Sequence, residues 1–302
     1  MGFVCGVFLL LTLTALARTE VVNDFKVCKD FFLKGKAPTV LPDQNRYKRI
    51  CQKYGKTTKT SQYHFATLYD TENKIPVYSA YKYDNKISCD RCDRKDGAWY
   101  IEPQLEGDNK VKDMTLQSKT SVRKTSLKQA LNNDYENSSF DRGHLLPFAH
   151  AQERCTKEAS FTLTNAVPQD PCLNRIWWLH MENKVLRYLR ECKEAYVVTG
   201  AVPSKSSATG NKIIEIGNKV NVPEYLWTAF CCRHANKWES MAHWAPNEPS
   251  GKINELTLTD LEKKLTQDYG LSNNFLIFGN TCQNPFQGIS TGSKRRCVPT
   301  GK

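Results

Sequence analysis

A short segment near the middle of the chain combines residue types that could act on a phosphate. It reads Asp141-Arg142-Gly143-His144. Histidine titrates near neutral pH and can serve as a general base, and a guanidinium can bind a phosphate through two hydrogen bonds. A tetrapeptide can also arise by chance, with Gly143 in a surface turn and His144 as a structural histidine. The segment alone therefore leaves both interpretations open.

A second group of polar residues follows on a predicted helix. Asp170 and Pro171 suit the N-cap and the first position of a helix, which we expect to run to about Cys192. Asn174 and Glu182 lie about two turns apart on one face of that helix. Two oxygen donors on one face could bind a hard cation, which a face used only for packing would not require.

A tryptophan stands between these two oxygen donors. Trp178 follows Asn174 by one turn on the same face. A tryptophan close to other apolar residues on a helix is more often part of the core than of a binding site. We therefore expect Trp178 to pack with Met181, Val185 and Leu189.

Taken together, these motifs resemble the DNA/RNA non-specific endonuclease family and its ββα-metal finger. The residues that carry the resemblance are Asp141-Arg142-Gly143-His144, Asn165, Pro168-Gln169, Asn174, Trp178 and Glu182. Other segments are similar to secreted members of this family, namely Pro76-Val-Tyr-Ser-Ala-Tyr81, Trp99-Tyr-Ile-Glu-Pro-Gln104 and Val222-Pro-Glu-Tyr-Leu-Trp227. The resemblance covers roughly residues 60 to 285.

The resemblance implies a role for four residues. His144 would take a proton from the attacking water, and Arg142 would position or neutralise the phosphate. Asn174 would be the one protein ligand of Mg²⁺, or of a similar dication such as Mn²⁺, and Glu182 would hold one of the metal's waters. Mg²⁺ keeps several waters and often uses few protein ligands. The implied reaction is hydrolysis of DNA, RNA or both, read through the phosphate backbone and therefore with little sequence preference.

Two arginines of the relatives lack obvious equivalents. One of them precedes the Asp-Arg-Gly-His segment near a tryptophan; here Arg94 and Lys95 are the nearest cations before Trp99. The other follows the metal-binding asparagine by about three turns, where this chain has Leu186. Arg187 could serve there if the helix contains a small irregularity. If neither arginine is replaced, the fold could have kept its finger while losing much of its rate.

These residues need a scaffold, and the sequence predicts one α+β domain, although a division into two remains open. We expect a mixed or antiparallel sheet flanked by helices, with the finger built from about Phe140 to Cys192. Phe65–Tyr69 and Val77–Tyr83 should form a hairpin, and Thr259 should cap a helix over residues 256–265. Further strands are expected at Phe161–Thr164, Tyr196–Gly200, Val222–Cys232 and Phe275–Gly279.

The first residues of the chain suggest export. Residues 1–17 read as a signal peptide with cleavage after Ala17, and no later stretch resembles a membrane-spanning helix. Residues 18–59 should form an irregular N-terminal arm pinned by Cys28 and Cys51, residues 60–285 the endonuclease domain and residues 286–302 a tail. Asn137-Ser138-Ser139 is a glycosylation acceptor and predicts a surface loop.

Charge and cysteine content fit this picture. The 43 basic and 31 acidic residues leave a formal charge of +12, which favours polyanionic partners or simply solubility. Twelve cysteines become eleven once Cys5 leaves with the signal, so we expect five disulfides and one thiol. The Cys89–Cys92 pair could be half a zinc site, but Cys231 and Cys232 are adjacent and supply no second such pair.

Five histidines besides His144 are present in the chain. His150 could line the cleft of His144, whereas the others lack partners at metal spacing and are expected to be structural or at the surface. These are His64, His180, His234 and His243.

Two rival functions remain. The first is that of a catalytically silent secreted protein that binds nucleic acid or another polyanion on the same scaffold. The second is a disulfide-rich extracellular interaction module, which leaves the ordered motifs unexplained.

Overall fold

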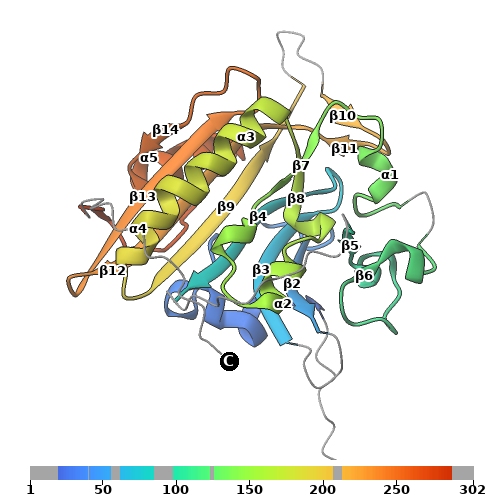
Figure 1. Ribbon diagram of the computed structural model, residues 1–302, viewed down its shortest axis with the longest axis horizontal. Coiled ribbons are helices and arrows are strands. Elements are labelled where there is room, and N and C mark those ends of the chain that lie inside the picture. Colours follow the sequence, from blue (N-terminus) through green and yellow to red (C-terminus); the bar gives the residue numbers. More distant parts are fainter. Residues whose placement is uncertain are drawn as a thin grey trace, which may run out of the picture.

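A nine-stranded sheet forms the centre of the molecule (Figure 1). The computed structural model describes residues 20–39, 41–55, 62–84, 98–122, 126–206 and 213–287. The strands lie in the order β1-β2-β3-β4-β9-β12-β13-β14, all antiparallel, and β15 joins β13 in parallel. They are Val21–Val22, Tyr47–Tyr54, Gln62–Asp70, Ile75–Tyr83, Ala195–Pro203, Pro223–His234, Lys237–Pro246, Asn254–Leu256 and, for β15, Asn284–Pro285. The predicted mixed or antiparallel sheet of an α+β fold is confirmed.

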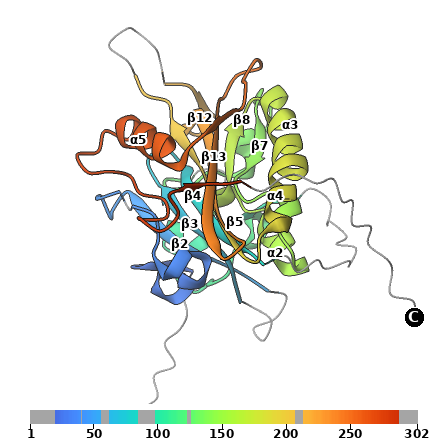
Figure 2. The same ribbon diagram turned by 90° about the vertical axis from the view of Figure 1, so that its left-hand side faces the viewer.

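Helices cover both faces of this sheet (Figure 2). On one face lies a long helix made of α3 (Pro171–Leu179), a π-helical turn (His180–Val185) and α4 (Leu186–Glu191). On the other face lies α5 (Leu258–Asp268), whose apolar residues share a core with the 3₁₀ helix Phe25–Phe31.

Because both faces are covered, the central strands are buried on both sides. On β12, Leu226 and Phe230 belong to the core beneath the long helix. The alternating residues Trp227 and Ala229 belong to the core beneath α5. The period of two along the strand therefore divides one apolar run between two cores.

Shorter elements complete the fold outside the central sheet. Three two-stranded ladders pair β5 with β6, β7 with β8 and β10 with β11. The elements not yet located are β5 (Tyr100–Ile101), β6 (Thr115–Leu116), α1 (Asn132–Tyr135), β7 (Asp141–His144), α2 (Arg154–Ala159), β8 (Ala166–Gln169), β10 (Glu215–Ile216) and β11 (Val220–Asn221). No helix in the described ranges has both the length and the apolar character that a membrane span requires.

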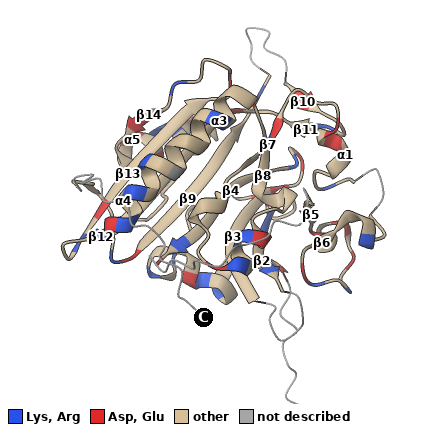
Figure 3. Cartoon of the chain, in the orientation of Figure 1, with Lys and Arg blue, Asp and Glu red and all other residues tan. Residues whose placement is uncertain are grey.

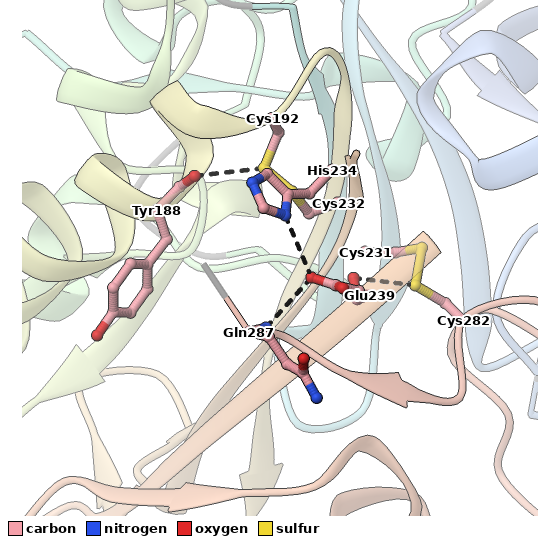
Figure 4. Close-up of a disulfide and its surroundings, with 8 residues drawn as sticks. All are labelled: Tyr188, Cys192, Cys231, Cys232, His234, Glu239, Cys282 and Gln287. Carbon is pink, nitrogen blue, oxygen red and sulfur yellow. Dashed lines mark hydrogen bonds and ion pairs between the residues drawn. A yellow bond between two sulfur atoms is a disulfide. The ribbon is translucent and has the colours of Figure 1, made fainter. Parts of the chain in front are cut away.

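Two adjacent cysteines attach segments to opposite faces of β12 (Figure 4). Cys232 bonds to Cys192 at the end of α4, and Cys231 bonds to Cys282 in the segment before β15. Neighbours on a strand point to opposite faces, so this pair fastens both layers to one strand.

A third disulfide joins Cys28 to Cys51 on β2, as the predicted pinning of the N-terminal segment requires. Cys89, Cys92 and Cys297 lie outside the described residues, so the count of five disulfides stays a prediction.

Some predicted elements differ from the structure. The segment expected to be an irregular arm contributes the regular strand β2. Three of its residues are basic, so the sequence lacks a clear alternation of apolar and polar residues. Their long side chains can nevertheless lie along the sheet and keep their charges in water. Phe275–Gly279 forms no strand. Its backbone N–H groups bond to side chains instead: that of Phe275 to Thr266 Oγ1 (2.8 Å) and that of Ile277 to Glu262 Oε1 (2.7 Å). The run has the apolar composition of a buried strand, but within the described residues it pairs with no neighbouring strand.

The predicted helix is present as α5, but it spans Leu258–Asp268 and not residues 256–265. Thr257, not Thr259, is the N-cap, and its hydroxyl accepts a hydrogen bond from the N–H of Asp260 (3.1 Å). The expected surface loop is confirmed, since Asn137 is exposed before β7. The predicted hairpin is also confirmed as β3 and β4, which pair in register from Ala66 opposite Ala80 to Asp70 opposite Ile75.

Glu262 on α5 should make stability depend on pH. Burial raises the pKa of this carboxyl to about 7, so its ionisation is disfavoured in the folded state. The stability that Glu262 contributes is fully present below the unfolded pKa near 4.5 and is lost as pH rises towards 7. Glu262→Gln, which keeps the acceptor for Ile277, should therefore be more stable than wild type at pH 8 by roughly 1–2 kcal/mol, after allowance for solvent screening.

Urea unfolding of both proteins at pH 4 and pH 8 checks this expectation. The difference in the free energy of unfolding should be small at pH 4 and should appear between pH 4.5 and 7. An equal difference at both values would show that Glu262 does not titrate as proposed.

Candidate active site

The central motif lies on a ββα unit, as predicted. Strands β7 and β8 pair antiparallel, with Asp141 opposite Gln169 and His144 opposite Ala166. The long helix follows at once, because Asp170 caps it: its Oδ1 accepts the N–H groups of residues 172 and 173 at 2.8 and 3.1 Å. Pro171 occupies the first turn, where its missing N–H costs nothing. The start of the helix is thus confirmed at the predicted residues.

A half-buried asparagine that the sequence does not single out holds β8 to the helix. Asn247 accepts the N–H of Asp170 through Oδ1 (2.9 Å) and donates through Nδ2 to the carbonyl oxygens of Pro168 (3.0 Å) and Pro223 (2.9 Å). Three backbone groups, two from the end of β8 and one from the start of β12, therefore meet at one amide. Nothing in the local sequence marks this role, because it depends on tertiary contacts.

A cavity of about 850 Å³ opens between β7 and α3. His144, Arg142 and Asn174 all line it, so three of the four predicted site residues are brought together. The further lining residues are Trp99, Asp141, Pro147, Phe148, Ala149, Lys157, Phe161, Trp177, Trp178 and Met181. The backbone of the fourth, Glu182, lies in the π-helical turn, but its side chain is outside the described part of the structure.

Two aromatic rings hold the imidazole of His144. The ring centroids of Trp99 and Phe161 each lie 4.8 Å from that of His144, with interplanar angles of 46° and 89°. Asn165 fixes the chain just after it, accepting the N–H of Leu146 (2.9 Å) and donating to its carbonyl oxygen (3.2 Å). Packing and hydrogen bonding together thus restrict the orientation of the imidazole in the cavity wall.

Arg142 presents a cation to the same cavity. Its Nη2 donates to the carbonyl oxygen of Asn132 (3.0 Å), and its guanidinium carbon lies 5.0 Å from the ring of Tyr135 and 5.9 Å from that of Trp99. Burial lowers the pKa of this guanidinium, but an arginine remains charged at any ordinary pH. No carboxylate among the described residues forms an ion pair with Arg142. Its charge is therefore available to an anionic ligand.

Asn174 is oriented by the first residue of the motif. Its Nδ2 donates to Oδ2 of Asp141 (3.0 Å), which leaves the amide oxygen as the group that can bind a cation. An amide oxygen beside a carboxylate is a hard donor set that suits Mg²⁺, an ion that keeps most of its water. The residues present therefore fit such a cation. The sequence assigned Asp141 no role of its own, because the pairing depends on the register of β7 with the helix.

The long helix contains a small irregularity, which was the condition for Arg187 to replace the second arginine of the relatives. Residues 180–185 form a π-helical turn, which adds one residue between Asn174 and Arg187. Arg187 thus moves to the place that Leu186 would hold in a regular helix, and Leu186 is buried. Arg187 is exposed and does not line the cavity, so its part in phosphate binding stays a prediction. The other candidates, Arg94 and Lys95, lie outside the described residues.

His150 forms a hydrogen bond to the backbone of the π-helical turn. Its Nε2 lies 2.9 Å from the carbonyl oxygen of Met181, so this nitrogen donates, and its Nδ1 accepts the hydroxyl of Tyr81 (2.8 Å). Burial lowers the pKa of His150 to about 4, which keeps the ring neutral at neutral pH. His150 does not line the cavity of His144. His64 is likewise satisfied, by Thr156 and by the backbone of Tyr54.

The prediction for Trp178 is wrong. Trp178 is 50% exposed and lines the cavity, whereas its neighbour Trp177 is 2% exposed and belongs to the core. The buried stripe runs through Leu173, Trp177 and Met181, at helical spacing, so the core face lies one residue away from the expected one. Two adjacent tryptophans made the two faces hard to distinguish in the sequence.

Gly143 should tolerate no side chain. A Cβ built there would lie 2.7 Å from Cβ of Gln169 and would also meet the amide of that side chain. Because Gly143 separates Arg142 from His144 on β7, the strain should displace both. We expect Gly143→Ala to lower the cleavage rate at least about tenfold and the free energy of unfolding by roughly 1–3 kcal/mol.

Cleavage assays and urea unfolding of Gly143→Ala and of the double variant with Gln169→Ala measure this effect. The double variant should recover part of both losses because the contact with the amide is removed. A fully active Gly143→Ala protein would contradict this account of the strand.

Two human proteins share sequence similarity with this chain. The chain is 32% identical over 248 residues to the Endonuclease domain-containing 1 protein of Homo sapiens, an alignment that covers 80% of this chain and 46% of that protein. It is 30% identical over 162 residues to mitochondrial Endonuclease G of Homo sapiens, covering 50% of this chain and 54% of the relative. The chain therefore spans about half the length of these relatives.

One solved structure and one family model also match this chain. The crystal structure of an EndoG/EndoGI complex matches with a TM-score of 0.51 at 20% identity, covering 70% of this chain and 82% of that one, which shows a common fold. Residues 43–274 match the model of the DNA/RNA non-specific endonucleases. The chain belongs to the DNA/RNA non-specific endonuclease family.

Proposed function

We propose that this protein is a secreted, Mg²⁺-dependent endonuclease that hydrolyses phosphodiester bonds of DNA, RNA or both with little sequence preference. The observation that carries the proposal is the single cavity in which His144, Arg142 and Asn174 meet. The family and the nuclease relatives support nuclease activity in general. The metal, the residue roles and secretion are our proposals.

Each residue of the cavity has its own role in hydrolysis. His144 accepts the proton of the water that attacks phosphorus, and its contacts with Trp99 and Phe161 keep the imidazole aligned. Arg142 binds the phosphate oxygens, and Lys157 adds a second cation on the cavity wall. None of these side chains reads base edges in this assignment, so weak sequence preference follows.

Asn174 would hold the cation through its amide oxygen, with Glu182 orienting a water of its shell. A cation held there would supply stabilisation of the negative charge that develops on the phosphate and on the leaving oxygen. Asp141 keeps the amide of Asn174 turned for this purpose by accepting its N–H group. Asp141 also places negative charge beside the cation, which should strengthen its binding.

Export fits the covalent structure. Three disulfides lie in the described part of the chain, and disulfides persist in oxidising compartments. The exposed Asn137 is available as a glycosylation site in such a compartment. The net charge of +12 is spread over most elements, with several Lys and Arg along α3 and α4 (Figure 3), and suits a polyanionic substrate.

Digestion of a supercoiled plasmid and of a structured RNA by the purified protein tests the proposal. Cleavage should require a divalent cation, should stop with EDTA and should return when excess Mg²⁺ is added. Conversion of the plasmid first to nicked and linear forms, and then to a smear without discrete bands, would show weakly specific endonuclease action. Binding without cleavage at any Mg²⁺ or Mn²⁺ concentration would instead support the silent scaffold.

A further inference from the structure

Two buried glutamates meet where the first strand of the central sheet contacts the segment after β5. Glu20 immediately precedes β1, and Glu102 immediately follows β5. Both residues are 0% exposed, and their side chains lie within hydrogen-bonding reach of each other. Neither residue lines the cavity of His144, so the pair is independent of the proposed function.

The four carboxyl oxygens of this pair do not all find hydrogen-bond donors. Oε1 of Glu20 accepts the N–H of Lys53 (2.9 Å). Oε1 of Glu102 accepts the hydroxyls of Thr162 (3.2 Å) and Thr164 (3.1 Å). The other oxygen, Oε2, is buried in both glutamates and receives no hydrogen bond from another described residue. Two ionised carboxylates in this place would leave both atoms unsatisfied and would set two like charges side by side.

We propose that Glu20 and Glu102 share one proton at neutral pH, and that this proton holds β1 to the rest of the fold as a pH-sensitive clasp. The proton belongs to Glu20, because the two threonine hydroxyls donate to Glu102 and favour its ionised form. The protonated Oε2 of Glu20 then donates to Oε2 of Glu102, which satisfies both atoms. Burial, and after it the charge of Glu102, raises the pKa of Glu20 well above its ordinary value of 4.5.

The charges around the pair do not favour a second negative charge. The neighbouring carboxylate of Asp113 raises the pKa of both glutamates, and Lys53 Nζ forms an ion pair with Asp113 (2.6 Å). The side chains bonded to the backbone of the two glutamates, those of Gln104 and Gln129, are uncharged. Beyond Gln129 lies a further carboxylate, that of Glu106 (3.4 Å from its Nε2). No described cation forms an ion pair with either glutamate.

Few other contacts among the described residues hold β1 in place. The strand is two residues long and pairs with β2 alone. The carbonyl oxygen of Glu20 accepts the N–H of Cys51 (2.8 Å), and Gln104 Oε1 accepts the N–H groups of residues 20 and 21 (2.9 and 3.0 Å). The disulfide from Cys28 to Cys51 fastens the following segment to β2. If the clasp opens, the released part should therefore end before Cys28.

The sign of the pH dependence follows from the raised pKa of Glu20. The stability that the clasp contributes is fully present below the ordinary pKa of 4.5 and is lost as pH rises through the folded pKa. Within that window Glu20 holds its proton when β1 is docked and releases it when β1 opens. The equilibrium constant for opening should therefore rise up to about tenfold for each pH unit, the dependence expected for one released proton.

Hydrogen exchange of the peptide that contains β1 measures this local opening. All proteins in the test carry Glu262→Gln, so that the titration of Glu262 does not contribute. The parent is compared with Glu20→Gln at each pH from 6 to 8, which cancels the intrinsic pH dependence of exchange. The glutamine amide donates to Glu102 as protonated Glu20 does, and its oxygen still accepts the N–H of Lys53. Opening should rise with pH in the parent and stay constant in Glu20→Gln.

A second variant and a spectroscopic measurement complete the test. Glu102→Gln should also remove the pH dependence, because its amide donates to ionised Glu20, so the test stays decisive if one variant does not fold. Glu72→Gln, at a carboxyl that is 64% exposed, should behave like the parent. The infrared difference spectrum between the parent and Glu20→Gln at pH 7 should contain the band of one protonated carboxyl. Absence of that band, or equal pH dependence in the parent and both glutamine variants, would overturn the proposal.

Discussion

His144→Ala should cleave nucleic acid about 10²–10⁴-fold more slowly than wild type, the usual contribution of a general base. Its affinity for nucleic acid should change little, because that affinity comes mainly from cations that neutralise phosphates. Arg142 and Lys157 remain in the cavity of the variant. Binding and cleavage should therefore separate. A cleavage time course and a binding curve at several salt concentrations measure the two effects.

Added imidazole gives this prediction its sharpest form. Removal of the ring leaves a space between Trp99 and Phe161, whose centroids each lie 4.8 Å from that of His144. Free imidazole can occupy this space and accept the proton, so it should restore part of the activity of His144→Ala. It should not restore His144→Phe, which fills the same space. A purely structural role for His144 predicts the opposite order, with the phenylalanine variant more active.

Two controls keep the interpretation clear. His234→Ala removes a histidine whose Nδ1 lies 3.6 Å from Oε2 of Glu239, outside the cavity, and it should cleave like wild type. Circular-dichroism melts show whether each variant folds. A folded His144→Ala protein that cuts at the wild-type rate would rule out His144 as the base. If wild type itself binds without cutting, the silent scaffold is the better description.

The sequence predicted the parts of the site that depend on local order. The motif on β7, the N-cap at Asp170 and the helix that carries Asn174 follow from residue types and short spacings, and the structure has all three. The interruption of that helix was foreseen only as a condition for Arg187, because a π-helical turn depends on contacts such as the hydrogen bond from His150 to Met181. The local sequence pattern does not reveal such tertiary contacts.

Tertiary contacts account for what the sequence did not predict. Trp99 and Phe161 are distant from His144 in the chain and pack against it only in the folded protein. The buried run at Phe275–Gly279 resembles a strand in composition, but side chains satisfy its backbone groups. The exposure of Trp178 was missed because its neighbour Trp177 occupies the core position.

Asn174→Ala should raise the Mg²⁺ concentration needed for half-maximal cleavage by about 100-fold or more. Loss of a residue that only supports a metal ligand commonly costs 10–100-fold in affinity, so loss of the one proposed ligand should cost at least the upper end of that range. The variant should fold, because the side chain of Asn174 is partly exposed and the N-cap at Asp170 is untouched. Titration of cleavage rate against Mg²⁺ measures the change.

Variants at neighbouring positions distinguish loss of the ligand from loss of the hydrogen bond to Asp141. Asp141→Asn removes the carboxylate but keeps an acceptor for the N–H of Asn174, so it should weaken Mg²⁺ less than Asn174→Ala does. Asn174→Asp keeps an oxygen donor but loses that N–H and sets two carboxylates side by side. It should retain Mg²⁺ binding better than alanine does, since two like charges in contact favour a dication between them. Asn183→Ala, at an exposed position on the same helix, should behave like wild type. Wild-type activity of Asn174→Ala at limiting Mg²⁺ would show that the cation binds elsewhere.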